Sequence, residues 1–303
     1  MDKEAQEQSH RDIMRAVRRI EIATRRAVNS ELAGRYQSVF KGQGMAFSEV
    51  RPYAPGDDIR HIDWNVTARH QKLFVKQFIE EREQTVMLLV DLSASGLFGT
   101  RRRTKRRLLA EVSGLLAFSA ISNNDRVGLL LFSEDTELFV PPRKGRKHVL
   151  RVVREIIEAE PSKRGTNIGA ALAYLSRVQK RRAVTFLLSD FLDDGFDAPL
   201  KVALARHDVI AMRVTDPAEI ELPNLGIVEV VDLETGTTAV VDSASARVRA
   251  AYAAQRHAAR ESTKKRLNRV DCDLIELSTD QDYVAPLVSF FRMRARRLRG
   301  GRS

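Results

Sequence analysis

Apolar and polar stretches alternate regularly in this sequence from residue 84 onward. Short apolar runs rich in strand formers recur, and between them lie longer segments whose apolar residues have helical spacing. Strands that alternate with helices predict crossover connections and a parallel sheet. We therefore predict an α/β fold with a doubly wound, mostly parallel sheet. Strands are predicted at 85–90, 126–132, 136–140, 183–188, 208–214 and 272–277, and a hairpin at 226–231 and 237–241. Helices are predicted at 102–122, 148–158, 197–206, 244–268 and 283–297, and a further one begins within 164–172. The pair Pro141 and Pro142 is expected to close the third strand.

The first 80 residues follow a different pattern. Residues 10–28 predict an amphipathic helix with Ile13, Val17 and Ile20 on one face. We expect this helix to pack on the rest of the fold, and contact with a membrane surface is the alternative. Glycines and prolines divide residues 35–80 into short β-prone pieces, which predict an irregular or antiparallel subdomain. The predicted domains are therefore 1–80 (N-terminal helix and small β-rich part), 81–298 (α/β domain) and 299–303 (disordered tail).

Composition limits the partners and the compartment. The chain has 303 residues, a formal charge of +11 and a single cysteine, Cys272, so an intramolecular disulfide is excluded. No apolar run is long enough to span a membrane and no signal peptide is evident, so we expect a cytoplasmic protein. Basic clusters such as residues 101–107 are interpreted as solvated helix ends, or else as surfaces for an acidic partner, anionic lipid or nucleic acid.

Oxygen-bearing side chains follow two predicted strands and precede one predicted helix. Asp91, Ser93 and Ser95 come after the first strand, Thr166 lies in a glycine-containing loop before a helix, and Asp190 follows the strand at 183–188. The carboxyl ends of parallel strands meet at one edge of such a sheet, so we expect these side chains to converge. Hard oxygen ligands suit Mg²⁺ or Mn²⁺. Taken singly, Thr166 could instead cap its helix, and Asp190 could cap the next helix or solubilise a loop.

A second group of polar residues surrounds the only tryptophan, Trp64. It contains Asp57, Asp58, His61 and Asp63, with Arg51, Arg60 and Arg69 interleaved. We expect the arginines to pair with these carboxylates. The alternative is a second metal or catalytic site.

The order Asp91-x-Ser93-x-Ser95, then Thr166, then Asp190 resembles a von Willebrand factor A (vWA) domain that carries a metal-ion-dependent adhesion site. The resemblance covers roughly residues 82–280 and implies an intact site that holds Mg²⁺ (or Mn²⁺). Upstream, residues 42–69 contain Arg-Pro-Tyr-x-x-Gly-Asp-Asp-Ile-Arg-x-Ile-Asp-Trp-Asn, which resembles the "domain of unknown function 58" (DUF58) family. That resemblance implies association with an AAA+ ATPase of the MoxR type.

These resemblances imply a non-enzymatic, metal-dependent protein-interaction module, chaperone-like in acting as an adaptor of the ATPase or its client. An acidic residue of the partner would complete the metal shell. One alternative is a nucleic-acid-binding protein that uses its basic surface. It is not favoured, because aromatic residues make up only 6% of the chain and are not interleaved with the basic ones. The other is a metal-dependent phosphoryl-transfer hydrolase with Asp91 as nucleophile, but Ser93 stands where a second acid is expected.

Overall fold

The computed structural model describes residues 15–24, 33–40, 46–70, 72–79, 83–100, 102–233 and 236–300. The chain forms two compact units, one from Met1–Val39 with Thr85–Ser303 and the other from Phe40–Gln84. The predicted domain of residues 1–80 is therefore divided, because its N-terminal part packs with the large unit. The predicted disordered tail of residues 299–303 is wrong at residues 299 and 300, which belong to helix α10 (Val284–Gly300), and residues 301–303 lie outside the described residues.

The large unit is built on a six-stranded sheet with the strand order β10-β7-β6-β3-β4-β5. All neighbours in this order are parallel except β4 and β5, which are antiparallel. The strands are β3 (Thr85–Asp91), β4 (Arg126–Phe132), β5 (Thr136–Arg143), β6 (Val184–Ser189), β7 (Asp208–Thr215) and β10 (Asp273–Ser278). The predicted α/β fold with a mostly parallel sheet is confirmed.

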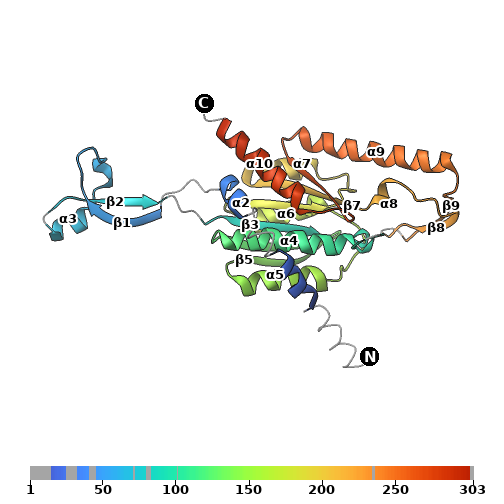
Figure 1. The fold of residues 1–303 in the computed structure, drawn as a ribbon, viewed down its shortest axis with the longest axis horizontal. Helices are drawn as coiled ribbons and strands as arrows, with labels where there is room; N and C mark the ends of the chain where they lie inside the picture. The colour runs from blue at the N-terminus through green and yellow to red at the C-terminus, as the bar shows by residue number, and fades with distance from the viewer. Residues whose placement is uncertain are drawn as a thin grey trace, which may run out of the picture. The chain divides into compact units, whose positions relative to one another are not determined.

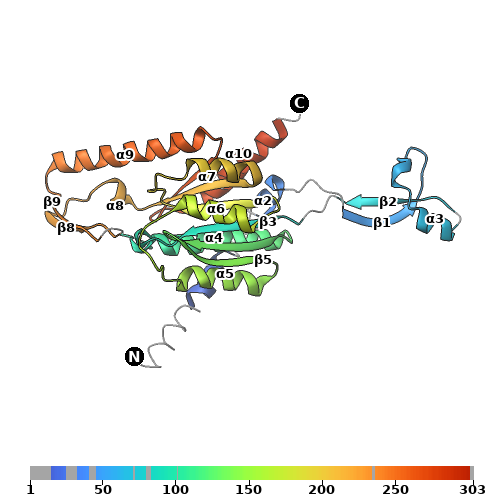
Figure 2. The same cartoon turned by 180° about the vertical axis from the view of Figure 1, so that it is seen from behind.

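Helices cover both faces of this sheet (Figures 1 and 2). Those of the large unit, besides α10 and a helix over residues 15–24, are α2 (Ala33–Val39), α4 (Lys105–Ser122), α5 (Arg146–Glu158), α6 (Ile168–Val178), α7 (Asp197–Arg206), α8 (Pro217–Ile220) and α9 (Ala246–Asn268). Helices α4 and α5 contact each other, as do α6 and α7. Because side chains alternate along a strand, Met87 and Leu89 of β3 face one core cluster, which includes Leu172 of α6 and Leu200 of α7.

Strand β5 differs from its prediction. It continues through Pro141 and Pro142 to Arg143 instead of ending before them. Proline lacks the N–H that a central strand must donate, but β5 is the last strand in the sheet order and pairs only with β4. The edge position therefore tolerates both prolines.

The helix over residues 15–24 packs within the large unit, as predicted. Val17 and Ile20 are each only 3% exposed. Ile20 lies against Gly114 of α4, where an added Cβ would be 2.9 Å from Ile20 Cγ2 and 3.3 Å from Val153 of α5. Its apolar face is thus occupied by protein and not free for a membrane surface; Ile13 lies outside the described residues.

Helix α2 is held by the helix that comes latest in the sequence. Tyr36 of α2 is 1% exposed and meets Phe291 of α10 edge-to-face, with 6.0 Å between the ring centroids. The Tyr36 hydroxyl donates to Asp125 Oδ2 at 3.3 Å. Helices α2 and α10 therefore form part of one apolar layer.

The small unit contains a two-stranded antiparallel sheet of β1 (Ala46–Pro52) and β2 (Phe74–Ile79), with η2 (Ile59–His61) and α3 (Trp64–His70) between them. Arg51 binds Asp57 through two hydrogen bonds of 2.7 and 2.6 Å. The Asp58 side chain caps η2, and the Asp63 side chain accepts from two N–H groups at the start of α3. These carboxylates thus have protein partners, as expected. The partners named here are Arg51 and backbone N–H groups, whereas the side chains of Arg60 and Arg69 were also expected to pair with them.

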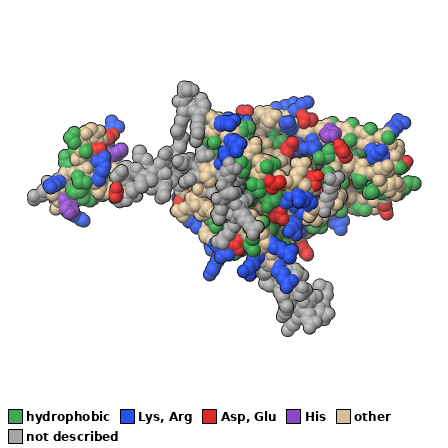
Figure 3. Space-filling model, viewed as in Figure 1, with side chains coloured by type: hydrophobic (Ala, Val, Ile, Leu, Met, Phe, Trp, Pro, Cys, Tyr) green, Lys and Arg blue, Asp and Glu red, His purple; other side chains and the backbone are tan. Residues whose placement is uncertain are grey.

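Many basic side chains of the large unit have acidic or carbonyl partners. Figure 3 shows lysine and arginine side chains interspersed with acidic ones on the face in view. In the run at 101–107, Arg103 binds Glu111 at 2.6 Å, Arg106 binds the Ala159 carbonyl at 2.8 Å and Arg107 binds Glu111 at 3.0 Å. This run anchors the start of α4 more than it forms a free basic patch.

The segment between β7 and α9 forms the predicted hairpin, from β8 (Ile227–Val231) and β9 (Thr238–Asp242), which pair antiparallel. It follows α8, which has a complete capping box at Asp216 and Glu219. Within the described part of the chain, no helix combines the length and apolarity needed to cross a bilayer.

Candidate metal centre

The loop after β3 folds back on its own carboxylate. Asp91 ends β3, and its Oδ1 accepts a hydrogen bond of 2.8 Å from the Ser93 N–H. The next residues form a short 3₁₀ helix, η3 (Ala94–Leu97), which turns Ser95 toward Ser93. Their hydroxyl oxygens lie 2.9 Å apart. Asp91, Ser93 and Ser95 are all buried, so their oxygen atoms are concentrated at the carboxyl end of β3.

The end of β6 interlocks with this loop. The Ser95 hydroxyl donates to Asp190 Oδ2 at 2.7 Å, and the Ser189 hydroxyl donates to Asp91 Oδ2 at 2.6 Å. Asp190 is buried and does not cap the next helix, because the N-cap position of α7 is Phe196. The predicted convergence of Asp91, Ser93, Ser95 and Asp190 is therefore present. Ser189 was not predicted, since a serine that ends an apolar run carries no signal of a partner 98 residues away.

The Thr166 loop is hydrogen-bonded to the same edge of the sheet. The Ala94 N–H donates to the Arg164 carbonyl at 3.2 Å, and the Asn167 N–H donates to the Ser133 carbonyl after β4 at 2.8 Å. Thr166, between these two anchors, is half-buried. The N-cap of α6 is Asn167, whose side chain accepts from the Ala170 N–H at 2.8 Å, so the alternative that Thr166 caps this helix is wrong.

A buried lysine adjoins this cluster and was not predicted as part of it. Lys105 is 2% exposed, and its Nζ donates to Asp190 Oδ2 at 2.8 Å and to Glu219 Oε1 at 2.6 Å. Its place in a basic run suggested a solvated helix end. The helical spacing carried a better signal, because Leu108, Leu109 and Val112 at i+3, i+4 and i+7 are all buried and put Lys105 on the apolar face of α4.

The electrostatics of the site are set by burial and by two neighbouring carboxylates. Burial, reinforced by repulsion from Asp190, raises the pKa of Asp91 to about 7, against hydrogen bonds from Ser189 and Ser93 that lower it. Burial lowers the pKa of Lys105, but attraction to Asp190 and Glu219 outweighs it, and the net shift is upward. Lys105 is therefore charged and compensates Asp190, whereas Asp91 accepts its hydrogen bonds from neutral groups, the Ser93 N–H and the Ser189 hydroxyl.

The donor set fits a hard divalent cation. Within the described residues, no group of three or more His, Cys, Asp or Glu side chains is arranged to hold a metal, so an ion here would depend on hydroxyl oxygens beside two carboxylates. Asp91 and Asp190 repel each other, and a cation between them would relieve that repulsion. Carboxylate and hydroxyl oxygens are ligands that suit Mg²⁺ and Mn²⁺.

Gly99 controls the path of this loop, because its backbone passes close to the start of α4. A Cβ on Gly99 would lie 2.5 Å from the Arg103 carbonyl oxygen and 2.6 Å from Thr104 Cα. We expect Gly99→Ala to lower the free energy of unfolding by about 1–3 kcal/mol in urea titrations, since backbone atoms must shift. Gly96→Ala is the matched control, because nothing lies within 4 Å of a Cβ there. Equal stability of the two variants would contradict this packing.

The comparisons with known proteins give one family and several distant structures. A family model described as "Protein of unknown function DUF58" matches residues 49–262. The uncharacterized protein Rv1480 of Mycobacterium tuberculosis (strain H37Rv) is 33% identical over 285 residues, which make up 93% of this chain and 89% of that protein. An aerotolerance-related membrane protein from Bacteroides fragilis aligns with 71% of this chain and 99% of its own, at 18% identity and a TM-score of 0.47. The VWA domain of SpRpn10 aligns with 69% of this chain and 95% of its own, at 11% identity and a TM-score of 0.38.

Proposed function

This chain belongs to the DUF58 family, and from the side chains gathered at its sheet edge we propose that it is a metal-dependent protein-interaction module. The observation that carries this proposal is the buried hydrogen-bonded series Asp91, Ser93, Ser95 and Asp190. It brings together two strand ends that are far apart in the sequence. The order of these residues resembles the adhesion site of vWA domains.

In this proposal Asp91, Ser93, Ser95 and Thr166 hold Mg²⁺, or Mn²⁺, and Asp190 supports the ion directly or through water. When bound, the ion supplies an electrophilic position for one carboxylate oxygen of a partner protein. The serine and threonine hydroxyls are neutral ligands, so they leave positive charge on the site for that carboxylate. Ser189 orients Asp91 by donating to Oδ2, and the Ser93 N–H fixes Oδ1. The proposed role is recognition and not catalysis.

Metal-dependent stability tests the site itself. We expect Mg²⁺ or Mn²⁺ to raise the unfolding temperature of the large unit relative to EDTA, because a ligand that binds only the folded state stabilises it by about 2.7 kcal/mol at a hundredfold excess over Kd. Asp91→Ala should abolish the metal-dependent increase. The control is Asp58→Ala, which removes an exposed carboxylate from the small unit and should retain the full increase. An equal metal-dependent rise in unfolding temperature in wild type and Asp91→Ala would contradict the proposal.

The partner is proposed from the family resemblance to be a MoxR-type AAA+ ATPase or its client, with this chain as adaptor. Binding of the purified chain to such an ATPase, with Mg²⁺ and nucleotide held constant, should be lost in Asp91→Ala and kept in Asp58→Ala. Comparing variants is sharper than adding EDTA, since a chelator also removes the metal that an ATPase needs for its nucleotide. Binding that is absent in wild type, or indifferent to Asp91, would rule out this partnership through the metal edge.

A further inference from the structure

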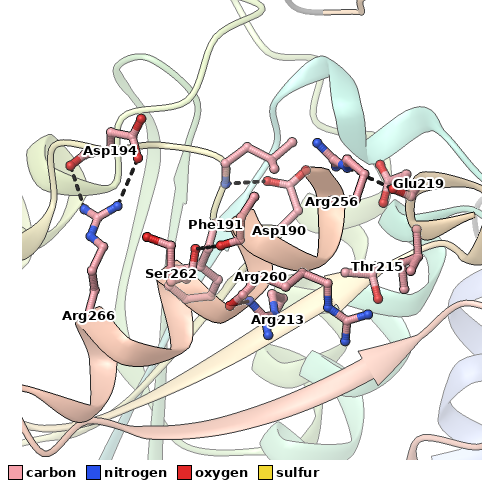
Figure 4. Close-up of a pocket in the computed structure, with 14 residues that line it drawn as sticks. Asp190, Phe191, Asp194, Arg213, Thr215, Glu219, Arg256, Arg260, Ser262 and Arg266 are labelled. Carbon is pink, nitrogen blue, oxygen red and sulfur yellow. Dashed lines mark hydrogen bonds and ion pairs between the residues drawn. The ribbon is translucent and has the colours of Figure 1, made fainter. Parts of the chain in front are cut away.

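A pocket opens beside the candidate metal centre, at the same end of the sheet. Its volume is about 330 Å³, and it lies among the ends of β6 and β7, helix α8 and one face of α9. Four arginines and three acids line it (Figure 4), and two of the acids, Asp190 and Glu219, also belong to the Lys105 cluster. The arginines are Arg213, Arg256, Arg260 and Arg266, and the third acid is Asp194.

All three acids of the pocket already have partners, and Asp194 binds Arg266 at 3.0 Å. Asp190 Oδ2 accepts from Ser95 and from Lys105, at 2.7 and 2.8 Å. Glu219 accepts from Lys105 through Oε1, and through Oε2 from the Asp216 N–H in the capping box of α8. The carboxylates of Asp190 and Glu219 therefore bind none of the pocket arginines, and Asp194 binds only Arg266 among them.

Arg266 is fully engaged by Asp194 and Asp197, but the other three arginines have more N–H donors than acceptors. Arg213 is 3% exposed, and its Nε has no hydrogen-bond partner among the described residues. Arg213 and Arg260 share a single carboxylate, Glu276. Arg256 donates through Nε to the Glu219 carbonyl at 2.8 Å, and no described residue binds its terminal nitrogens. Arg256 and Arg260 are four residues apart on α9, so both face the pocket.

A group with free N–H donors inside a cavity selects an acceptor, and guanidinium groups match a carboxylate by paired hydrogen bonds. Asp190 and Glu219 also line the pocket, so a dianion would meet more repulsion there than a carboxylate with one charge. The volume is at the small end of the range for ligand sites, which suits one side chain. Asp190 belongs to both the pocket and the metal centre, so one acidic segment can reach both.

We propose that this arginine-lined pocket binds a second carboxylate of an acidic peptide segment in the partner protein, next to the carboxylate that reaches the metal centre. The proposal deepens the proposed function and rests on it for the partner being a protein. The pocket itself needs no metal. Its donors are the partly exposed Arg256 and Arg260 and the buried Arg213.

The test uses the full chain and a fluorescein-labelled hexaglutamate peptide, with anisotropy measured at constant ionic strength in EDTA. Hexaglutamine is the uncharged control peptide. We expect Arg256→Gln and Arg260→Gln each to weaken hexaglutamate binding about tenfold, as for the loss of a charge-assisted hydrogen bond. Arg247→Gln removes the same charge from an exposed position of α9 outside the pocket and should change affinity less than twofold. Thermal unfolding checks that each variant is folded.

The outcomes separate the pocket from the metal centre. A selective loss in Arg256→Gln and Arg260→Gln supports the pocket, even where Asp91→Ala shows no metal effect. Equal losses in all three variants would show general charge attraction and overturn the proposal, as would no hexaglutamate binding or no loss in any variant. A rise in unfolding temperature with inorganic phosphate that is lost in Arg256→Gln, without hexaglutamate binding, would also overturn the proposal. The pocket would then be a phosphate site.

Discussion

Lys105→Met should lower the free energy of unfolding by about 3–5 kcal/mol at neutral pH, because removing one partner of a buried ion pair leaves its counterpart uncompensated. Two carboxylates lose their cation in this variant. The Lys105 ammonium lies 2.8 Å from Asp190 and 2.6 Å from Glu219, and it is only 2% exposed. Methionine keeps most of the side-chain length and removes the charge. Urea unfolding followed by circular dichroism gives the difference.

Lys201→Met is the matched control, since the same substitution at an exposed position of α7 should change stability by less than about 0.5 kcal/mol. The metal proposal adds a second expectation. Mg²⁺ should stabilise Lys105→Met more than it stabilises wild type, because a divalent cation then replaces the missing charge beside Asp190. A Lys105→Met protein as stable as Lys201→Met would contradict the ion-pair assignment.

Because of Asp91, the free energy of unfolding of the metal-free protein should fall as the pH rises from about 4 to about 7. Folded Asp91 keeps its proton up to a pKa of about 7, mainly because it is buried, whereas the unfolded carboxyl releases it near 3.8. The folded state binds more protons across this interval, so raising the pH favours unfolding. Each unit of pKa difference corresponds to 1.36 kcal/mol, and the whole interval therefore corresponds to a few kcal/mol.

Asp91→Asn isolates this contribution, because the amide has a similar shape and does not titrate. In EDTA, the wild type should lose stability relative to Asp91→Asn as the pH rises through the interval. Saturating Mg²⁺ should flatten the wild-type curve, since a bound cation favours the carboxylate and competes with its proton. Parallel pH profiles of the two proteins in EDTA would show that Asp91 does not titrate there.

The fold was predictable where local pattern and tertiary environment agree. After the exposed Arg126, residues 127–132 form an uninterrupted run without polar side chains that is buried in the sheet, and both predicted ends, 126 and 132, coincide with β4. Helix α7 likewise begins at Asp197 and ends at Arg206, as its pattern predicts. Helix α8 is only four residues long, which is too short for a periodic signal, and it was missed. Strand β5 was predicted too short because the sequence does not reveal that it lies at an edge.

The candidate site was predictable only in part for a related reason. Asp91, Ser93, Ser95 and Asp190 were found because their positions at strand ends imply a common edge. Lys105 and Glu219 are linked to that edge by contacts spanning 85 and 114 residues, which no spacing rule reveals. The sequence placed Thr166 in the loop before α6 but could not decide which side chain caps that helix, because both threonine and asparagine are good caps. In the structure the cap is Asn167.

The contact between α2 and α10 sets an order for the maturation of this protein on the ribosome. Tyr36 is made long before Phe291, and at 5–20 residues per second the interval is of the order of ten seconds or more. Until α10 emerges, the apolar face of α2 lacks the ring that buries it in the finished structure. Strands β3, β4 and β5 can meanwhile pair as they appear, because they are neighbours in both the sequence and the sheet, and β6 and then β7 can add on the other side of β3. Completion of the large unit is therefore delayed until its latest helix is released, and the nascent chain presents an uncovered apolar surface to chaperones throughout that time.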